Sequence, residues 1–364
     1  MKIILGLARL IVGVLFIFSG LVKANDPLGL SYKMQEFFEV WGWHFLNDYT
    51  LAFSILMIAF EIIAGVAVLL GWKMNLFSWL LLLLIVFFTF LTGYALFSGK
   101  IRTCGCFGDC IPLTADQSFM KDIILLMLIL FIFLYRKKIQ PVFKPGITIG
   151  LLLLTTLFSF AGQWYVLKYL PVADCLPYKK GNYIPEKMKV PPGAIADSTV
   201  VTFVYEKEGK QLEIINNNFP DDFDDSVYHF IKRYDKLVRK GNAEPAIKDF
   251  TLTTLDDIDS TQALLAKENT IALLFYNEKE TNLLPSFENT VTALQQKNIP
   301  VYIVTSTPDK LKDKTQLPVL KCDYVAIKTA ARANPTLYFI KKGVILNKWA
   351  GADFDKAAKE SVQQ

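Results

Sequence analysis

Long apolar runs occupy the first 170 residues of the chain and do not recur after that point. A helix needs roughly 20 consecutive, mostly apolar residues to cross the hydrocarbon core of a bilayer. Five stretches approach this length, and the fourth is the weakest because Lys121 and Asp122 lie near its start. We predict five transmembrane helices, over Ile3–Val22, Leu51–Leu70, Leu76–Phe97, Phe119–Tyr135 and Gly146–Leu167.

The first apolar stretch also has a feature of a secretory signal peptide, since Lys2 precedes it. It lacks a small-x-small cleavage pattern before Lys23, and four further apolar stretches follow it. We therefore expect this stretch to remain in the chain as a membrane helix.

After about residue 170, Asp, Glu and Lys become frequent, which predicts a soluble half behind the membrane half. The chain as a whole is 52% hydrophobic and has a formal charge of +5, which is small for 364 residues. Its basic residues form no stripe, so we expect no nucleic-acid partner.

Basic residues in short loops predict the orientation of the spans. The compact cluster after the fourth span places that loop in the cytoplasm: Arg136, Lys137, Lys138 and Lys144. Five spans then put the N-terminus inside, and Ala24–Thr50, Ser98–Ser118 and everything after Leu170 outside. We expect a multi-pass protein of the bacterial inner (cytoplasmic) membrane with a periplasmic C-terminal domain. Outside, Tyr32–Trp43 predicts a short amphipathic helix, either on the membrane interface or in an aromatic belt.

Three of the five cysteines lie within one external loop, as Cys104, Cys106 and Cys110. Cysteines on the oxidising side of a membrane pair or exchange. A Cys104–Cys106 disulfide closes a very small ring, and strained, exposed disulfides are the labile ones. Gly105 and Gly108 allow the chain to turn tightly there. The three cysteines are therefore candidate catalytic residues, with Cys110 as a resolving thiol.

Two other interpretations of the loop stay open. The cysteines can form a structural disulfide with one spare thiol, or thiolates can hold zinc or copper. A metal site is the weakest of the three, because the two histidines of the chain, His44 and His229, lie far away in the sequence. We assign no metal.

Residues 1–140 resemble a known membrane superfamily. The run Gly6 to Lys23, with Arg9, Gly13 and Ser19-Gly20, is similar to the opening helix of DoxX-like proteins, and Cys104-Gly-Cys106-Phe-Gly108 with Ile111-Pro112 resembles their MauE branch. The resemblance implies a four-helix bundle, to which the fifth span is an addition. It also implies disulfide formation or maturation of exported proteins beside a thioredoxin-like partner, and DoxX relatives are linked to quinone-dependent oxidation.

Glu61 lies near the middle of the second span, where a carboxylate is costly unless it is paired, protonated or in a polar cavity. Arg9 of the first span is the expected partner. The pair is either a structural ion pair between two helices or a proton or quinone site beneath the cysteine loop.

The soluble half begins with a predicted hairpin, Thr199–Tyr205 and Gln211–Ile215, followed by an acidic loop over residues 221–225. From Ala243 onward strands and helices alternate, which favours an α/β sandwich around a mixed sheet. The expected elements are strands at Ile271–Tyr276, Pro300–Ser306, Tyr324–Ile327, Pro335–Lys341 and Gly343–Trp349, and a helix at Ser286–Lys297.

Residues 243–358 resemble the thioredoxin fold. Asn334-Pro335-Thr336 is similar to the segment in which a cis proline precedes a strand, and Glu244 to Phe250 is similar to the opening segment of exported thioredoxin-like proteins. The departure is that Asn277–Asn282, where the family has its Cys-x-x-Cys pair, holds no cysteine. Without two thiols the domain should not catalyse exchange. The remaining role is binding an extended client segment along a sheet edge.

The last two cysteines lie in the soluble half. Cys322 is expected to be a buried free thiol, away from the thioredoxin active position. Cys175 follows the fifth span directly, at the level of the external loop. It can bond with a loop cysteine and act as a relay.

These observations predict an all-α membrane bundle, four helices plus a fifth span, with a C-terminal α/β thioredoxin-like domain. The leading hypothesis is a thiol–disulfide oxidoreductase or maturation factor for exported proteins, coupled to a quinone. Its partners would be an exported client, a separate thioredoxin-like protein and membrane lipid. The rivals are a non-enzymatic envelope scaffold with structural cysteines and a transport bundle around Glu61 and Arg9. The expected divisions are residues 1–140 (bundle), 141–170 (fifth helix), 171–242 (linker and hairpin) and 243–364 (thioredoxin-like).

Overall fold

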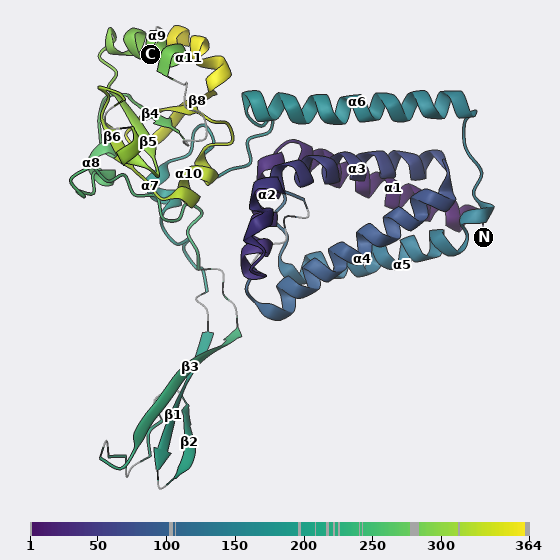
Figure 1. Cartoon of the computed structure of the whole chain (residues 1–364), viewed down its shortest axis with the longest axis horizontal. Coiled ribbons are helices and arrows are strands. Elements are labelled where there is room, and N and C mark those ends of the chain that lie inside the picture. The colour runs from purple at the N-terminus through teal and green to yellow at the C-terminus, as the bar shows by residue number, and fades with distance from the viewer. Residues whose placement is uncertain are drawn as a thin grey trace.

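The computed structural model shows a membrane bundle, a C-terminal α/β domain and a separate small sheet (Figure 1). It describes residues 2–101, 105, 107–195, 198–207, 209–215, 218–220, 223–224, 226–239, 241, 243–276, 284–311 and 314–360. Within these residues five helices are long and apolar enough to cross a membrane, in agreement with the sequence. They are α1 (Lys2–Ala24), α3 (Thr50–Leu70), α4 (Met74–Ser98), α5 (Ala115–Leu134) and α6 (Pro145–Tyr169).

The first four spanning helices form the bundle core, and α6 lies outside it. One buried apolar cluster combines residues of α1, α3, α4 and α5, such as Val12, Val68, Leu81 and Ile129, and α6 adds none of its described residues. Figure 1 shows α6 running beside α1 and α3. The fifth span is therefore an addition to a four-helix bundle, as the resemblance implied.

Glycines let α1 and α3 approach closely. A Cβ atom on Gly13 would lie 2.5 Å from the Leu69 side chain, and one on Gly65 would lie 2.9 Å from the carbonyl oxygen of Gly13. Small residues at helix contacts are the usual means of close packing in membranes, where apolar burial alone drives little association.

A helix covers the end of the bundle at which the cysteine loop lies. This helix, α2 (Pro27–Val40), matches the expected amphipathic helix but begins five residues earlier. Asp26 caps its N-terminus by accepting a hydrogen bond from the Gly29 N–H group, and Pro27 occupies the first helical position. Both are standard helix-start signals. A 3₁₀ turn (His44–Tyr49) leads from α2 into α3.

The C-terminal domain is built on a five-stranded mixed sheet in the order β6-β5-β4-β7-β8. β4 pairs in parallel with β5 and antiparallel with β7. This order, with a hairpin of β7 and β8 at one side, is consistent with a thioredoxin-like domain. The strands are β4 (Ile271–Phe275), β5 (Val301–Thr305), β6 (Val319–Lys321), β7 (Thr336–Lys341) and β8 (Val344–Ala350).

Both faces of this sheet are covered, because alternate residues of each strand point to opposite sides. Leu273 and Phe275 of β4 pack with the helices on one face, and Ala272 and Leu274 pack with those on the other. The first face is covered by α7 (Ile184–Lys187), α8 (Thr261–Leu265) and α10 (Tyr324–Ala330), and the second by α9 (Leu284–Gln295) and α11 (Phe354–Glu360).

One expected strand is a helix. Tyr324–Ile327 was predicted as a short strand, but it opens α10, and the short strand is β6, just before it. The side chain of Asp323 accepts hydrogen bonds from the N–H groups of Val325 and Ala326, which caps the helix. The prediction was wrong because it weighed the apolar residues and overlooked this capping signal.

A three-stranded antiparallel sheet, β2-β1-β3, stands apart from the other two parts (Figure 1). The predicted hairpin is present as β1 (Ser198–Lys207) and β2 (Lys210–Ile215). A third strand, β3 (His229–Arg239), was not predicted and pairs along the other side of β1.

Candidate functional site

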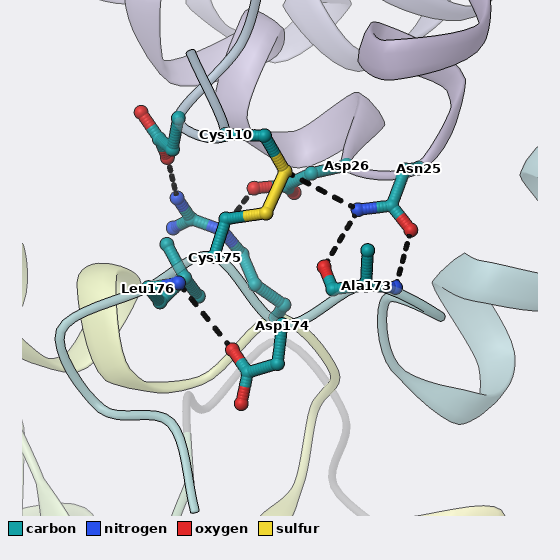
Figure 2. Close-up of a disulfide and its surroundings, with 9 residues drawn as sticks. Asn25, Asp26, Cys110, Ala173, Asp174, Cys175 and Leu176 are labelled. Carbon is teal, nitrogen blue, oxygen red and sulfur yellow. Dashed lines mark hydrogen bonds and ion pairs between the residues drawn. A yellow bond between two sulfur atoms is a disulfide. The ribbon is translucent and has the colours of Figure 1, made fainter. Parts of the chain in front are cut away.

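A disulfide joins the cysteine loop to the segment that leaves the fifth span. Cys110 bonds to Cys175, 65 residues later, with Cα atoms 4.8 Å apart (Figure 2). The loop and the soluble half therefore lie at the same end of the bundle. Cys104 and Cys106 lie outside the described residues and remain the predicted exchange pair.

The loop turns as its glycines suggested. Gly105 and Gly108 have φ angles of 66° and 58°, in the left-handed region of backbone conformation that residues with a side chain rarely adopt. The Gly108 N–H group donates to the carbonyl oxygen of Gly105 at 3.0 Å, which closes the turn. Phe107 lies between these two glycines in the sequence. The ammonium nitrogen of Lys121 lies over its ring, 5.4 Å from the ring centroid.

Asn25, at the end of α1, holds the segment that carries Cys175. Its side chain donates to the Ala173 carbonyl at 2.8 Å and accepts from the Ala173 N–H group at 2.9 Å (Figure 2). Its amide nitrogen also lies 4.0 Å from the Cys110 sulfur atom. The disulfide is thus braced by the residue that directly follows the first span.

Arg332 of the C-terminal domain reaches into the membrane domain beside this disulfide. Its guanidinium donates to Asp26 at 2.8 Å and to Asp109 at 2.7 Å, and the side chain is only 5% exposed. Burial alone lowers the pKa of Arg332, but the two carboxylates outweigh it and raise the pKa, so the group stays charged. Burial also raises the pKa of the adjacent Tyr32 to about 12.

A second ion pair links the same two parts. Lys348 of β8 binds Asp174 at 2.8 Å, and its side chain is 9% exposed. Burial lowers the pKa of Lys348, and Asp174 partly offsets this effect. The carboxylate of Asp174 also accepts from the Leu176 N–H group, as Figure 2 shows. Each half of the disulfide is therefore preceded by an aspartate that binds a cation of the C-terminal domain.

Glu61 pairs with a different residue from the one predicted. Its carboxylate forms a buried ion pair with Lys23 and accepts from the Ser19 hydroxyl at 3.2 Å. Arg9 instead donates to the carbonyl oxygens of Val68 and Leu69 at 3.2 and 2.9 Å. The expected Arg9–Glu61 pair was wrong, because α1 and α3 run antiparallel and Arg9 lies opposite the far end of α3.

A second buried carboxylate lies across the bundle. Asp122 of α5 is fully buried, forms an ion pair with Lys121 and accepts from the Thr92 hydroxyl at 3.1 Å. It lines the same small cavity as Glu61, Ser19 and Phe107. The charges near the start of the fourth span are therefore part of the bundle interior.

A larger apolar cavity of about 450 Å³ lies between α1, α2, α3 and α4, below the cysteine loop. Gly105, the residue between Cys104 and Cys106, forms part of its wall. Lys23 and Lys121 also line it, while their carboxylate partners do not. Ligand pockets of 300–1,000 Å³ are typical for small organic molecules. Its apolar wall includes Phe37, Phe38, Trp41, Phe53, Phe60 and Phe87.

The C-terminal domain carries the expected proline, and the Asn334–Pro335 peptide bond is cis. Cys322 is free and buried, and burial raises the pKa of its thiol to about 12. Client binding along an edge of this sheet has less support. Residues 181–184 already bond with the first half of β8, and Thr253 exchanges backbone hydrogen bonds with Lys321 of β6.

Some residues of this site escaped sequence reasoning. Asp109 and Asp174 each directly precede a cysteine of the disulfide, and this shared Asp-Cys pattern could have marked them as site residues. Arg332 offered none, since its partners lie 223 and 306 residues away in the chain. Within the described part of the chain, no cluster of three or more His, Cys, Asp or Glu residues has the arrangement of a metal site.

Comparisons with known proteins agree with the division seen in the structure. Residues 1–135 match the family model described as methylamine utilisation protein MauE, and residues 199–240, the separate small sheet, match a domain of unknown function (DUF8463). Protein TlpB of Flavobacterium psychrophilum is 26% identical over 155 residues, which is 42% of this chain and 42% of TlpB. No solved structure matches the chain. The match to the MauE family therefore covers the helices α1 to α5, and α6 and the soluble half lie outside it.

Proposed function

We propose that this protein is a membrane-bound thiol–disulfide oxidoreductase that matures exported proteins. One observation carries the proposal: Gly105, between Cys104 and Cys106, lines an apolar cavity inside the bundle. In this proposal the cavity is the site of a membrane-soluble electron acceptor, and the contact of Gly105 links the Cys104-Gly-Cys106 segment to it. The Cys110–Cys175 disulfide would hold the loop in place while this pair exchanges with the client.

The exchange step moves two electrons and two protons from the client to the Cys104–Cys106 pair. A client thiolate attacks one sulfur atom of a Cys104–Cys106 disulfide, and the second client thiol then displaces the mixed disulfide. The client gains a disulfide, and Cys104 and Cys106 become two thiols. To start again, this pair must lose two electrons and two protons to an acceptor.

The lining of the cavity supports a quinone as that acceptor. Its walls are aromatic and apolar, as a ring and an isoprenoid tail require, and the ammonium groups of Lys23 and Lys121 would donate hydrogen bonds to ring oxygens. Behind these lysines, Glu61 and Asp122 keep both cations oriented. A bound quinone would supply a two-electron, two-proton acceptor.

The site would face the periplasm of a bacterium, with the N-terminus in the cytoplasm. The basic turn Arg136–Lys138 follows α5, at the end of the bundle opposite the Cys110–Cys175 bond. Basic loops favour the cytoplasmic side. Because the C-terminal domain has no cysteine over residues 277–282, a separate thioredoxin-like protein would be the first client and would pass its disulfide on to other exported proteins.

A second candidate function is a non-enzymatic envelope scaffold. The Cys110–Cys175 disulfide favours it, because this bond ties the soluble half to the bundle as a structural crosslink would. In that case Cys104 and Cys106 would also stay permanently oxidised.

The redox state of the loop in living cells separates these functions. Acid quenching, alkylation and mass analysis should find Cys104 and Cys106 partly as thiols and partly as a disulfide. Cys106→Ala should trap a mixed disulfide with a client, whereas Cys322→Ala, which removes a buried thiol, should not. Complete oxidation that never changes would overturn the oxidoreductase and leave the scaffold.

A further inference from the structure

The turn between α10 and β7 contacts the membrane domain next to the cysteine loop. Arg332 lies in this turn, three residues before the cis Pro335. Its guanidinium uses all three nitrogens: Nη1 donates to the Lys328 carbonyl of its own domain, and Nε and Nη2 donate to Asp26 and Asp109. The guanidinium presents five donors in a fixed planar fork, whereas a lysine ammonium is a compact point charge with three rotatable donors.

The two carboxylates belong to different parts of the membrane domain. Asp26 starts α2, while Asp109 directly precedes Cys110 in the loop. Arg332 therefore fixes the loop relative to α2, the helix that lies over the cavity. Nearby, Lys348 binds Asp174 and Lys328 donates to Gln35 of α2 at 2.7 Å, so cations of one domain meet acceptors of the other at three points.

Arg332 also affects the pKa of the loop thiols, because it neutralises two carboxylates beside the loop. Without Arg332, the carboxylates of Asp26 and Asp109 would stand uncompensated beside the loop. Negative charge disfavours a thiolate and raises the pKa of the thiol, which slows exchange. With Arg332 in place this repulsion is neutralised, and the loop is held at the mouth of the cavity.

We propose that the C-terminal domain acts on its own membrane domain: Arg332 is a positioning residue that holds the cysteine loop, and this face of the domain has that loop as its partner. The inference rests on the proposed function for its effect on exchange. It also accounts for a thioredoxin-like domain without active-site cysteines, whose sheet edges are already partly paired.

The test uses the full chain in lipid nanodiscs, oxidised beforehand and mixed with a reduced peptide that contains two cysteines. Arg332→Gln should lower the single-turnover rate of peptide oxidation several-fold, because the peptide thiolate attacks the loop disulfide and a loop thiol of higher pKa is a slower leaving group. It should also speed hydrogen exchange of the backbone over residues 105–111. If Arg332→Gln fails to fold, Asp109→Asn is the alternative, because it removes the loop carboxylate that Arg332 binds. This variant should also speed the hydrogen exchange of residues 105–111.

The matched control is Arg233→Gln, which breaks an exposed pair with Asp235 on the separate small sheet and should change neither measurement. Arg332→Lys should restore only part of the rate. If Arg332→Gln behaves like the control in either measurement, the positioning role is wrong. A wild-type chain that oxidises no peptide would overturn the proposed function instead, and hydrogen exchange alone would then decide whether Arg332 holds the loop.

Discussion

Removing one partner of the Lys23–Glu61 pair should destabilise the bundle strongly. The two side chains are only 3% and 1% exposed, so Lys23→Met would leave a carboxylate buried without its counter-charge. Breaking a buried pair in this way costs about 3–5 kcal/mol. At 1.4 kcal/mol per factor of ten, the folding equilibrium should shift by roughly two to three and a half orders of magnitude.

The remaining contact of Glu61 does not replace the pair. The Ser19 hydroxyl donates to the carboxylate at 3.2 Å, and a hydrogen bond to a charged group contributes about 1.5–3 kcal/mol. Lys23→Met should therefore cost several kcal/mol even with this contact intact. The double variant Lys23→Met/Glu61→Gln buries no charge at this position and should recover much of the loss.

The assay is a double-mutant cycle on the full chain in mixed micelles. Unfolding by SDS is followed through helix content, for the wild type, both single variants and the double variant. We expect a coupling energy above 2 kcal/mol in magnitude, since contacting residues couple by about 0.5–3 kcal/mol. As control, Arg9→Met removes two bonds to carbonyl oxygens and should show no coupling with Glu61→Gln. Additive effects of Lys23→Met and Glu61→Gln would refute the reasoning.

Two further predictions concern buried positions. The Cys322 thiol, whose pKa burial raises from the usual 9.0 to about 12, should resist iodoacetamide in the folded chain at pH 9 and react at that pH in denaturant. The pKa of this thiol is higher in the folded chain than in the unfolded chain, so its contribution to stability is complete below pH 9 and decreases from pH 9 towards 12. Equal reactivity with iodoacetamide in the folded and the denatured chain would contradict its burial. Gly13→Leu should disrupt the contact of α1 with α3, since even a Cβ atom would lie 2.5 Å from Leu69, whereas Gly6→Leu, with nothing within 4 Å, should unfold like the wild type. The same SDS titration measures both glycine variants, and equal stability of the two would exclude close packing at Gly13.

The spanning helices and the sheet of the C-terminal domain could be predicted from the sequence, because each depends on a local pattern. Apolar length marks a membrane helix, and short apolar runs beside turn residues mark strands such as Ile271–Phe275 and Val301–Thr305. The third strand of the small sheet, His229–Arg239, lacks such a run. Lysine and arginine recur along it, and it forms by pairing with β1.

The partners of the buried charges could not be predicted, because they depend on how helices face each other. Lys23 lies 14 residues after Arg9, which is about 21 Å along a helix at 1.5 Å per residue. Only the antiparallel contact, which places Gly20 against Ile62, decides that Glu61 meets Lys23. The bridge from Arg332 to Asp109 depends in the same way on the docking of two domains.

The bond between Cys110 and Cys175 turns α5, α6 and their connecting loop into a closed covalent ring. Such a ring can close only after both helices have been inserted, so its formation reports the completion of membrane assembly. A protease that cuts the basic turn at Arg136–Lys138 would leave the two fragments attached to each other. They would migrate as one species on a non-reducing gel and as two after reduction.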